Sequence, residues 1–308
     1  SNAWYGYSVS GAGDINGDGL TDLIVGSDNA YATTATLRPL ESYGTVGGRS
    51  YVVFGRTGSG LVNLSGLSAT TNTDGFMLST PFASGWSVSD AGDVNGDGLS
   101  DMAVTAPAYN VRQGEAFIVY GKSDGSPVVT GSSSFVAASQ GFVIEGGMVD
   151  GYTAALSTVS SGDVNGDGLS DIIAGAWFTN NGQGSVYVVF GSSNDDARAR
   201  VSLSSLSNPA SGQGFRIIGE SYTGVSVAGV SDVNGDGLDD VILQSTMGKA
   251  GTNTNPGVAW VAFGKTSGST LNVSAIEAGT GGFAIDLGLV NANYGAYTVA
   301  NAGDFNGD

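Results

Sequence analysis

The sequence predicts an all-β protein, a β-propeller built from tandem four-stranded antiparallel blades. The 308-residue chain holds 52 glycines and is 41% hydrophobic, which is typical of a turn-rich chain that can bury a core. A nine-residue acidic phrase recurs about every 70 residues, beginning at Asp14, Asp93, Asp163 and Asp232. Similar segments surround each copy. A fixed period of this kind indicates a repeat architecture.

Each repeat contains four short segments with strand-like sequences. The first alternates before the acidic phrase, as at residues 86–89, and the second is a β-branched run after it, as at 23–25. The third ends in an aromatic-glycine pair, as at Phe190-Gly191, and the fourth opens on Gly-Phe, as at Gly214-Phe215. Period-2 alternation between glycine-rich turns predicts strands.

Four-stranded sheets in tandem are typical of a β-propeller, because each blade buries its faces against its neighbours. We expect one domain over residues 4–308. Its predicted blades span about 4–79, 85–145, 152–218 and 223–286, followed by a partial fifth at 295–308. Residues 1–3, Ser-Asn-Ala, are typical of an expression-tag scar. We therefore expect the natural protein to extend upstream.

The repeated phrase D-x-N-G-D-G-L-x-D predicts a calcium loop. Oxygen-bearing side chains occupy positions 1, 3, 5 and 9, and a backbone carbonyl is available at position 7. Hard oxygen ligands in a tight turn are what Ca²⁺ prefers. We expect four Ca²⁺, and a fifth where the last copy is completed. The predicted ligands are Asp14, Asn16, Asp18, Leu20 and Asp22; Asp93, Asn95, Asp97, Leu99 and Asp101; Asp163, Asn165, Asp167, Leu169 and Asp171; Asp232, Asn234, Asp236, Leu238 and Asp240; and Asp304, Asn306 and Asp308.

The loop allows two other interpretations. An EF-hand needs a glutamate at position 12 and flanking helices, whereas position 12 is apolar in all four complete copies. A metal-free hairpin turn remains an alternative, although aspartate at positions 1 and 9 of every complete copy favours a metal. Without metal, we expect three converging carboxylates to repel by about 4 kcal/mol per pair at 4 Å and an effective dielectric near 20. Metal would then stabilise the fold.

Composition excludes several classes of function. The chain has no histidine and no cysteine, so nucleophile triads, thiol chemistry and zinc sites of the common kinds are excluded. Ten basic residues against 28 acidic ones give a net charge of −18, and scattered basic residues do not favour nucleic acid as a partner. The sequence has no run of 18 apolar residues, so we expect no membrane insertion.

These motifs together resemble the FG-GAP repeat family, found in the integrin α-subunit head and in exported bacterial proteins. The resemblance rests on the acidic hairpin and on Phe54-Gly55, Phe190-Gly191 and Phe263-Gly264. A Gly-Ala-Pro element is matched partly at Ala106-Pro107 and Gly175-Ala176. The resemblance implies a propeller, usually of seven blades, with Ca²⁺ in the hairpins.

Three functions stay open at this point. The first is a non-catalytic, calcium-binding module for adhesion or recognition of a protein or glycan, within a larger extracellular, cell-surface or periplasmic protein. The second is an enzyme, which is disfavoured because the recurring aspartates already belong to the loops. The third is an accessory or spacer domain of an exported hydrolase whose catalytic site lies outside this fragment. The rim opposite the loops is the candidate binding face, with aromatic residues Tyr31, Tyr43, Tyr109, Trp177, Phe178, Tyr222 and Tyr294.

Overall fold

The chain forms two compact units, each of which holds two sheets. Unit 1 comprises Ser1–Glu145 with Ser192–Val201, and unit 2 comprises Gly146–Gly191 with Ser202–Asp308. The computed structural model describes residues 4–28, 48–68, 72–80, 84–107, 114–129, 138–149, 152–153, 156–193, 199–245, 258–286 and 298–303. The fifth acidic copy lies outside the described residues, as do Tyr31, Tyr43, Tyr109 and Tyr294.

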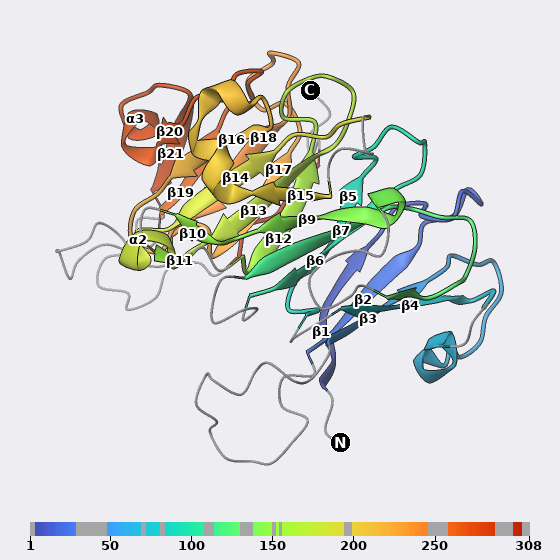
Figure 1. The fold of residues 1–308 in the computed structure, drawn as a ribbon. Coiled ribbons are helices and arrows are strands. Elements are labelled where there is room, and N and C mark those ends of the chain that lie inside the picture. Colours follow the sequence, from blue (N-terminus) through green and yellow to red (C-terminus); the bar gives the residue numbers. More distant parts are fainter. Residues whose placement is uncertain are drawn as a thin grey trace, which may run out of the picture. The chain divides into compact units, whose positions relative to one another are not determined.

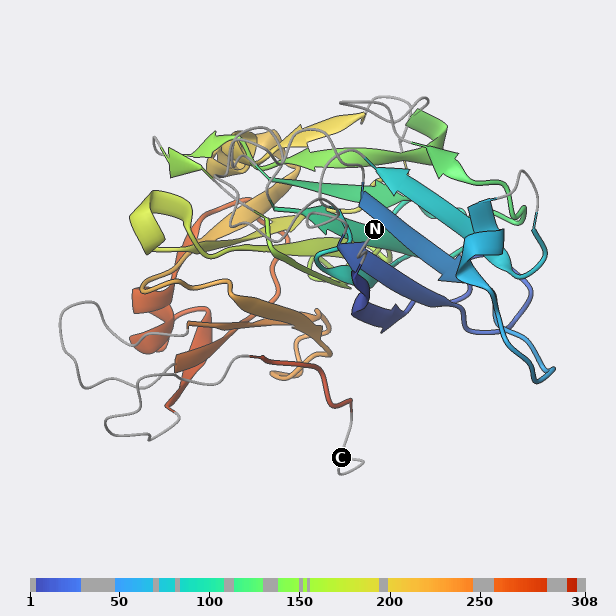
Figure 2. The same cartoon turned by 90° about the horizontal axis from the view of Figure 1, so that it is seen from below.

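Unit 1 contains sheets 1 and 2, which are mainly antiparallel (Figure 1). Sheet 1 has the order β1 (Trp4–Gly11), β2 (Leu23–Asp28), β3 (Gly48–Val53), β4 (Gly75–Thr80) and β8 (Val128–Val129). Sheet 2 has the order β5 (Val88–Gly92), β6 (Asp101–Ala106), β7 (Glu115–Val119), β9 (Gly141–Glu145) and β15 (Arg200–Ser202). The strands β1 to β4, coloured blue to cyan, lie side by side in both views (Figures 1 and 2).

Unit 2 contains sheets 3 and 4. Sheet 3 has the order β12 (Thr158–Gly162), β13 (Asp171–Ala176), β14 (Ser185–Val189), β16 (Gly214–Ile218) and β20 (Leu271–Asn272). Sheet 4 has the order β17 (Ser226–Val230), β18 (Asp240–Gln244), β19 (Val258–Ala262) and β21 (Gly282–Asp286). A small hairpin pairs β10 (Met148–Val149) with β11 (Tyr152–Thr153). The described helices are single turns: η2 (Leu64–Ser68), η3 (Ala138–Gln140), α2 (Thr179–Gly182), η5 (Leu203–Ser207), η6 (Pro209–Ser211) and α3 (Val273–Glu277).

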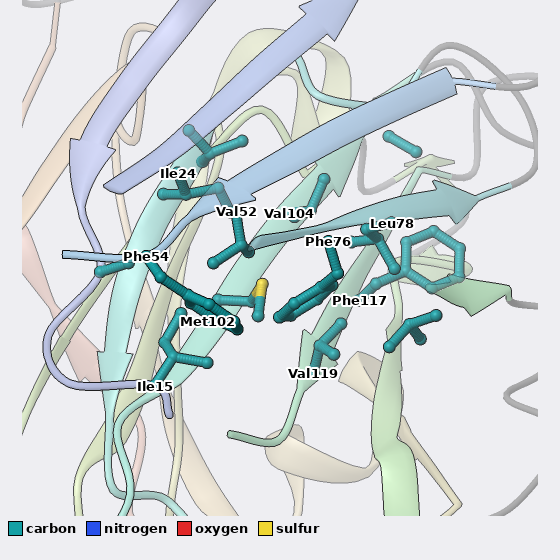
Figure 3. Close-up of a cluster of buried hydrophobic side chains, with 14 of the residues drawn as sticks. Ile15, Ile24, Val52, Phe54, Phe76, Leu78, Met102, Val104, Phe117 and Val119 are labelled. Carbon is teal, nitrogen blue, oxygen red and sulfur yellow. The ribbon is translucent and has the colours of Figure 1, made fainter. Parts of the chain in front are cut away.

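Alternating side chains place one apolar layer between the two sheets of each unit. In unit 1, Phe76 of β4 packs in the same buried cluster as Met102 of β6 and Phe117 of β7 (Figure 3). In unit 2, Phe215 of β16 and Trp260 of β19 share the corresponding cluster. Burying each such side chain contributes about 1.5–3 kcal/mol relative to its exposed form. The all-β prediction is therefore confirmed, with four main sheets formed by the four repeats.

Three of the four sheets carry a fifth strand that the sequence did not predict. The additional strands are β8, β15 and β20, and each lies between the third and fourth strands of the next repeat. β8 pairs in parallel with β4, and β20 pairs in parallel with β16. We call this connection, an extended segment followed by a helical turn, the strap. Its paired segments hold two or three residues, too few for a period-2 pattern to be recognised.

No helix within the described residues is long and apolar enough to cross a membrane.

Candidate metal loops and an aromatic cluster

Each complete acidic phrase forms a tight loop between the first and second strands of its repeat. In the first loop, Gly17 and Gly19 have φ angles of 77° and 85°, a left-handed conformation that glycine adopts without steric cost. These two residues turn the backbone so that successive N–H groups point to the aspartate at position 1. The other three complete loops have the same pair of positive-φ glycines.

The aspartate at position 1 accepts three backbone hydrogen bonds. Oδ1 of Asp14 accepts from the N–H groups of Gly17 at 2.7 Å and Asp18 at 3.0 Å, and Oδ2 accepts from Gly19 at 2.8 Å. The same three bonds form at the equivalent residues Asp93, Asp163 and Asp232. At Asp232 these bonds, first that from Gly237, lower the pKa of the carboxyl group, because they favour its charged form.

Positions 3 and 5 are joined to each other on the exposed side of the loop. The Asn16 side chain donates from Nδ2 to Oδ2 of Asp18 at 3.0 Å and accepts from the Asp18 N–H at 2.9 Å. Asp18 in turn accepts from the N–H of Leu20 at 2.9 Å. The predicted ligand side chains at positions 1, 3 and 5 are thus brought together on one short turn.

The aspartate at position 9 has a different environment. Asp22 is fully buried, and it accepts hydrogen bonds from the N–H of Ile15 at 2.9 Å and the N–H of Gly55 at 2.7 Å. The glycine of the aromatic-glycine pair is therefore bound directly to the acidic loop. The remaining three copies have the same bond, which joins Asp101 to Gly121, Asp171 to Gly191 and Asp240 to Gly264.

Sequence reasoning missed this link, although both motifs recur in the same order in every repeat. The reason for glycine is also visible in the structure. A Cβ atom on Gly55 would lie 2.6 Å from Cβ of Leu20 and 2.7 Å from the carbonyl oxygen of Thr21. Gly121 and Gly264 lie equally close to their own loops. A side chain at this position would therefore collide with the loop.

Burial raises the pKa of the position-9 carboxyl groups. The pKa of Asp101 rises to about 8 and that of Asp171 to about 7, in each case mainly through desolvation. The N–H bonds from Gly121 and Val94 lower the pKa of Asp101 by less, and the charges of Asp97 and Asp93 raise it further. The pKa values of Asp22 and Asp240 are raised for the same first reason. A cation beside such a group would favour its ionised form.

The donor set of each loop fits a hard cation in its chemistry. Aspartate and asparagine oxygens with a backbone carbonyl are the ligands that Ca²⁺ takes. Within the described residues, however, no group of three or more acidic side chains is placed to hold a metal ion by itself. The expected close convergence of three carboxylates is therefore not seen, because the carboxylates at positions 1 and 9 turn to different backbone N–H groups.

Three of the predicted rim aromatics form a cluster in unit 2. The strand β13 begins at Asp171 in the third loop and ends at Ala176, so Trp177 lies at the end of the strand opposite the loop. The ring of Trp177 lies 5.3 Å from that of Phe178 and 5.8 Å from that of Tyr222, measured between centroids. Phe178 is 37% exposed. We call these three residues the aromatic cluster.

The backbone under the aromatic cluster is strained. Among the described residues, the non-glycine residues with positive φ all lie in the two segments that carry the cluster: Asn180, Asn181, Ser221 and Tyr222, with φ angles of 50° to 66°. Such conformations cost about 1–3 kcal/mol each and persist only where the surrounding structure enforces them. Strain of this kind is typical of functional sites.

Four similar sheets, each with an acidic hairpin bound to an aromatic-glycine pair, define an all-β repeat protein. The FG-GAP repeat profile matches this chain at residues 5–53, 84–120 and 155–189. The chain therefore carries FG-GAP repeats at these three places. Each matched stretch contains one acidic loop and the strands on both sides of it.

The relatives that the chain matches are much longer proteins. Mouse phosphatidylinositol-glycan-specific phospholipase D is 28% identical over 204 residues, which cover 63% of this chain and 22% of that protein. Integrin alpha-4 of Xenopus laevis is 29% identical over 182 residues, or 58% of this chain and 15% of the integrin. Integrin alpha-5 of the same species is 26% identical over 243 residues, which cover 79% of this chain and 20% of that integrin. The chain thus spans about a fifth of the length of these relatives.

Proposed function

We propose that this chain is a calcium-binding, non-catalytic β-propeller module that recognises a protein or glycan partner within an exported or cell-surface protein. The observation that carries the calcium proposal is the identical arrangement of oxygen donors in four separate loops. Four independent copies of one hydrogen-bond pattern are far more than a hairpin turn requires. The similarity to integrin alpha subunits supports the proposal that this chain is a recognition module.

The residues that would hold Ca²⁺ are those at positions 1, 3, 5, 7 and 9 of each loop. Positions 1, 3 and 5 lie on the exposed side, where a cation can enter, and position 9 ties the site to the sheet through its bond to the aromatic-glycine pair. Bound Ca²⁺ would neutralise the acidic loop and stabilise the folded state by mass action. The module would then be rigid in a calcium-rich compartment.

Calorimetric titration tests the calcium proposal. Wild-type protein should bind four Ca²⁺ with dissociation constants of about 10⁻⁴–10⁻³ M, as in extracellular modules. The variant Asp97→Asn should bind one fewer ion, whereas Asp74→Asn, an exposed aspartate outside the loops, should leave the stoichiometry unchanged. The absence of binding heat, together with a melting temperature that neither chelator nor Ca²⁺ changes, would contradict the proposal.

The aromatic cluster is the proposed recognition face. The three rings supply apolar surface, and Trp177 and Tyr222 add an indole N–H and a hydroxyl group, a combination that anchors many interfaces. The amide side chains of Asn180 and Asn181 lie in the same strained segment, where they can add hydrogen bonds to a partner. The strained backbone fixes these groups before a partner arrives, which lowers the entropic cost of binding.

Glycan and protein arrays probed with the calcium-loaded chain test this face. Binders should be lost or weakened at least tenfold by Trp177→Ala and Tyr222→Ala, a loss of about 1.4 kcal/mol or more. Trp86→Ala is the control, because Trp86 is an exposed tryptophan outside the cluster. A binder that Trp177→Ala leaves unaffected would place recognition elsewhere on the molecule.

A further inference from the structure

The first and second acidic loops bond to each other through one peptide group. The N–H of Ser100, at position 8 of the second loop, donates to the carbonyl oxygen of Asp14, at position 1 of the first loop, at 3.0 Å. The carbonyl of the same peptide group belongs to Leu99, the predicted position-7 ligand of the second loop. A peptide group is planar and trans, so its C=O and N–H point in opposite directions. A cation that fixes the carbonyl of Leu99 therefore also fixes the N–H that holds Asp14.

A second route joins the buried aspartates at position 9 of the same two loops. Oδ1 of Asp101 accepts from the N–H of Gly121 at 2.8 Å. The next residue, Lys122, donates its N–H to the carbonyl oxygen of Ile15 at 2.8 Å. The N–H of Ile15 in turn donates to Oδ2 of Asp22 at 2.9 Å. Two adjacent residues therefore bond to both loops through their main-chain N–H groups.

The third and fourth loops repeat both routes within unit 2. The N–H of Asp239, at position 8 of the fourth loop, donates to the position-1 carbonyl oxygen of the third loop at 3.0 Å. The N–H of Lys265 donates to the carbonyl oxygen of Val164 at 2.9 Å, and the neighbouring Gly264 donates to Asp240 at position 9. Because the same contacts form in two separate pairs of loops, they belong to the design of the repeat.

The side chain at position 7 also lies against the preceding loop. A Cβ atom on Gly17 would lie 3.0 Å from Cδ2 of Leu99, and one on Gly166 would lie 2.5 Å from Cδ2 of Leu238. Gly17 and Gly166 are at position 4, where the N–H donates to the carboxylate at position 1. The position-7 residue of one loop therefore packs on the turn that orients the first ligand of the loop before it.

The pair in unit 2 has one additional bond. Oδ2 of Asp239 accepts from the N–H of Asp163 at 2.9 Å. Both main-chain polar groups of Asp163 thus bond to one residue of the fourth loop. Serine stands at the same position of the second loop and has no carboxylate to offer. We therefore expect the third and fourth loops to be linked more strongly than the first and second.

We propose that the acidic loops bind Ca²⁺ as coupled pairs, the first with the second and the third with the fourth, and that an ion in one loop tightens binding in the other. This inference rests on the proposed calcium function of the loops. The main-chain bonds provide the coupling, because an ion that orders one loop also fixes groups that hold the ligand residues of its partner. By linkage, the effect on affinity is equal in both directions.

Repulsion between the bound ions acts in the opposite direction. Each filled loop gains two positive charges, which lower the attraction of the neighbouring loop for a second cation. Salt screens this effect, since the Debye length falls to about 3 Å at an ionic strength of 1 M. Main-chain hydrogen bonds and side-chain packing are not screened in this way. Measurements in about 1 M KCl therefore isolate the contribution of the contacts.

Titration with Ca²⁺ followed by nuclear magnetic resonance measures each loop separately. The glycine at position 6 supplies the signal, because its N–H donates to the position-1 carboxylate of its own loop. The four reporters are Gly19, Gly98, Gly168 and Gly237. Their amide shifts should change as the cation occupies the carboxylate, which gives a binding curve for each loop.

Variants that leave one loop of a pair able to bind give the size of the coupling. Asp97→Asn disables the second loop and leaves the first, whereas Asp18→Asn does the reverse. Compared with these single-loop curves, the wild-type curves in about 1 M KCl should require a coupling factor of at least about five, the lower end of typical values. One factor should describe both loops. The control Asp74→Asn, outside the loops, should give the wild-type curves.

Two pairs of variants test whether the contacts provide the coupling. Lys122→Pro removes the N–H that bonds to Ile15, whereas Lys122→Ala keeps it, so the coupling factor in unit 1 should fall only with proline. In unit 2, Asp239→Ala removes the acceptor for the Asp163 N–H, whereas Asp239→Asn keeps an oxygen acceptor and loses only the charge. The coupling factor there should fall with alanine and persist with asparagine. Circular dichroism and thermal melting check that the variants are folded.

The outcomes distinguish this proposal from the calcium proposal. Four loops that bind Ca²⁺ with a coupling factor of one or less in about 1 M KCl would overturn the pairing and leave calcium binding intact. Equal coupling in the alanine and asparagine variants of Asp239 would also overturn it, because the contact would then have no effect. Loop signals that do not respond to Ca²⁺ at all would overturn both proposals.

Discussion

The buried aspartate at position 9 connects two motifs that lie far apart in each repeat. Asp22 receives one hydrogen bond from its own loop and one from Gly55, which is 33 residues away. A buried carboxylate that lost one of these donors would be left partly unsatisfied, at a cost of about 1–3 kcal/mol. The glycine is needed because its N–H must approach where a side chain would collide with Leu20.

Replacement of Gly55 by alanine should therefore destabilise the protein. The new Cβ would meet Leu20 and Thr21 at less than van der Waals distance, and overpacking of this kind costs about 1–3 kcal/mol. Gly58→Ala is the control, because a Cβ at Gly58 meets nothing within 4 Å. Urea unfolding of both variants measures the difference, and equal stabilities would show that the close approach at Gly55 is not needed.

The buried Glu115 makes the stability of the protein depend on pH. Its carboxyl group is almost fully buried, with Oε1 at 3.6 Å from Arg200 and Oε2 without a partner among the described residues. Burial raises its pKa to about 7, against a smaller lowering by Arg200. Between pH 4.5 and 7 the folded state thus holds a proton that the unfolded state has lost. This group therefore makes stability fall as the pH rises through that window.

Glu115→Gln should remove this pH dependence. The variant should match the wild type near pH 5 and exceed it by about 1–3 kcal/mol at pH 8, since one pKa unit corresponds to about 1.4 kcal/mol. Unfolding free energies at the two pH values measure this. Both chains share the raised pKa of Asp101, so their difference isolates Glu115. A wild type that is more stable than the variant at pH 8 would contradict the prediction.

The turn at positions 1 to 7 of each acidic loop could be predicted from the sequence, because the side-chain hydrogen bonds of Asp14, Asn16 and Asp18 stay within the loop. Asp14 and Gly19 lie five positions apart, and the spacing alone predicts their proximity. The bond between Asp22 and Gly55 could not be predicted in this way. It depends on the pairing of β2 with β3, which single-residue patterns do not specify.

At the level of elements, the strap makes three of the four sheets depend on the repeat that follows them. Val201 of β15 is fully buried, although it belongs to the third repeat and extends sheet 2. The four long strands of each repeat could be predicted from their alternating or β-branched sequences. The straps could not, because two paired residues carry no periodicity and the parallel partner belongs to another repeat.

A matched pair of substitutions measures how much the strap contributes to the free energy of unfolding. Val201→Ala should cost about 2 kcal/mol, through lost burial and the cavity left behind. Val62→Ala, at the corresponding position between the third and fourth strands of the first repeat, should cost clearly less, because Val62 is only partly buried. Chemical denaturation at low protein concentration provides the comparison. Equal losses would mean that Val62 is buried in solution.

For the whole molecule, the excess of negative charge is concentrated rather than spread evenly. The net charge is −18, and about half of the acidic residues belong to the loops that follow the first strand of each repeat. Self-repulsion of this kind destabilises a compact state. Each bound Ca²⁺ would add two positive charges where repulsion is strongest.

Salt should therefore stabilise the metal-free protein more than the calcium-loaded one. Raising the ionic strength from about 0.1 M to about 1 M shortens the Debye length from about 10 Å to about 3 Å. The melting temperature in chelator should rise by a few degrees over this range, since about 1 kcal/mol corresponds to about 2–4 °C at this chain size. Scanning calorimetry with and without Ca²⁺ measures both responses. An identical salt response in the two states would show that bound Ca²⁺ does not relieve the repulsion between the acidic residues.

The strap also has a consequence for the order in which the molecule is made. Sheet 1 has all four of its long strands once Thr80 has been synthesised, but its outer edge is covered only when Val128 of the next repeat arrives. The same delay separates β16 from β20 in sheet 3. On the ribosome, each of these sheets therefore exposes an unpaired edge until most of the following repeat has emerged. Uncovered edges pair readily with other chains. The rate of translation through one repeat therefore sets how long the edge of the preceding sheet can pair with a wrong chain.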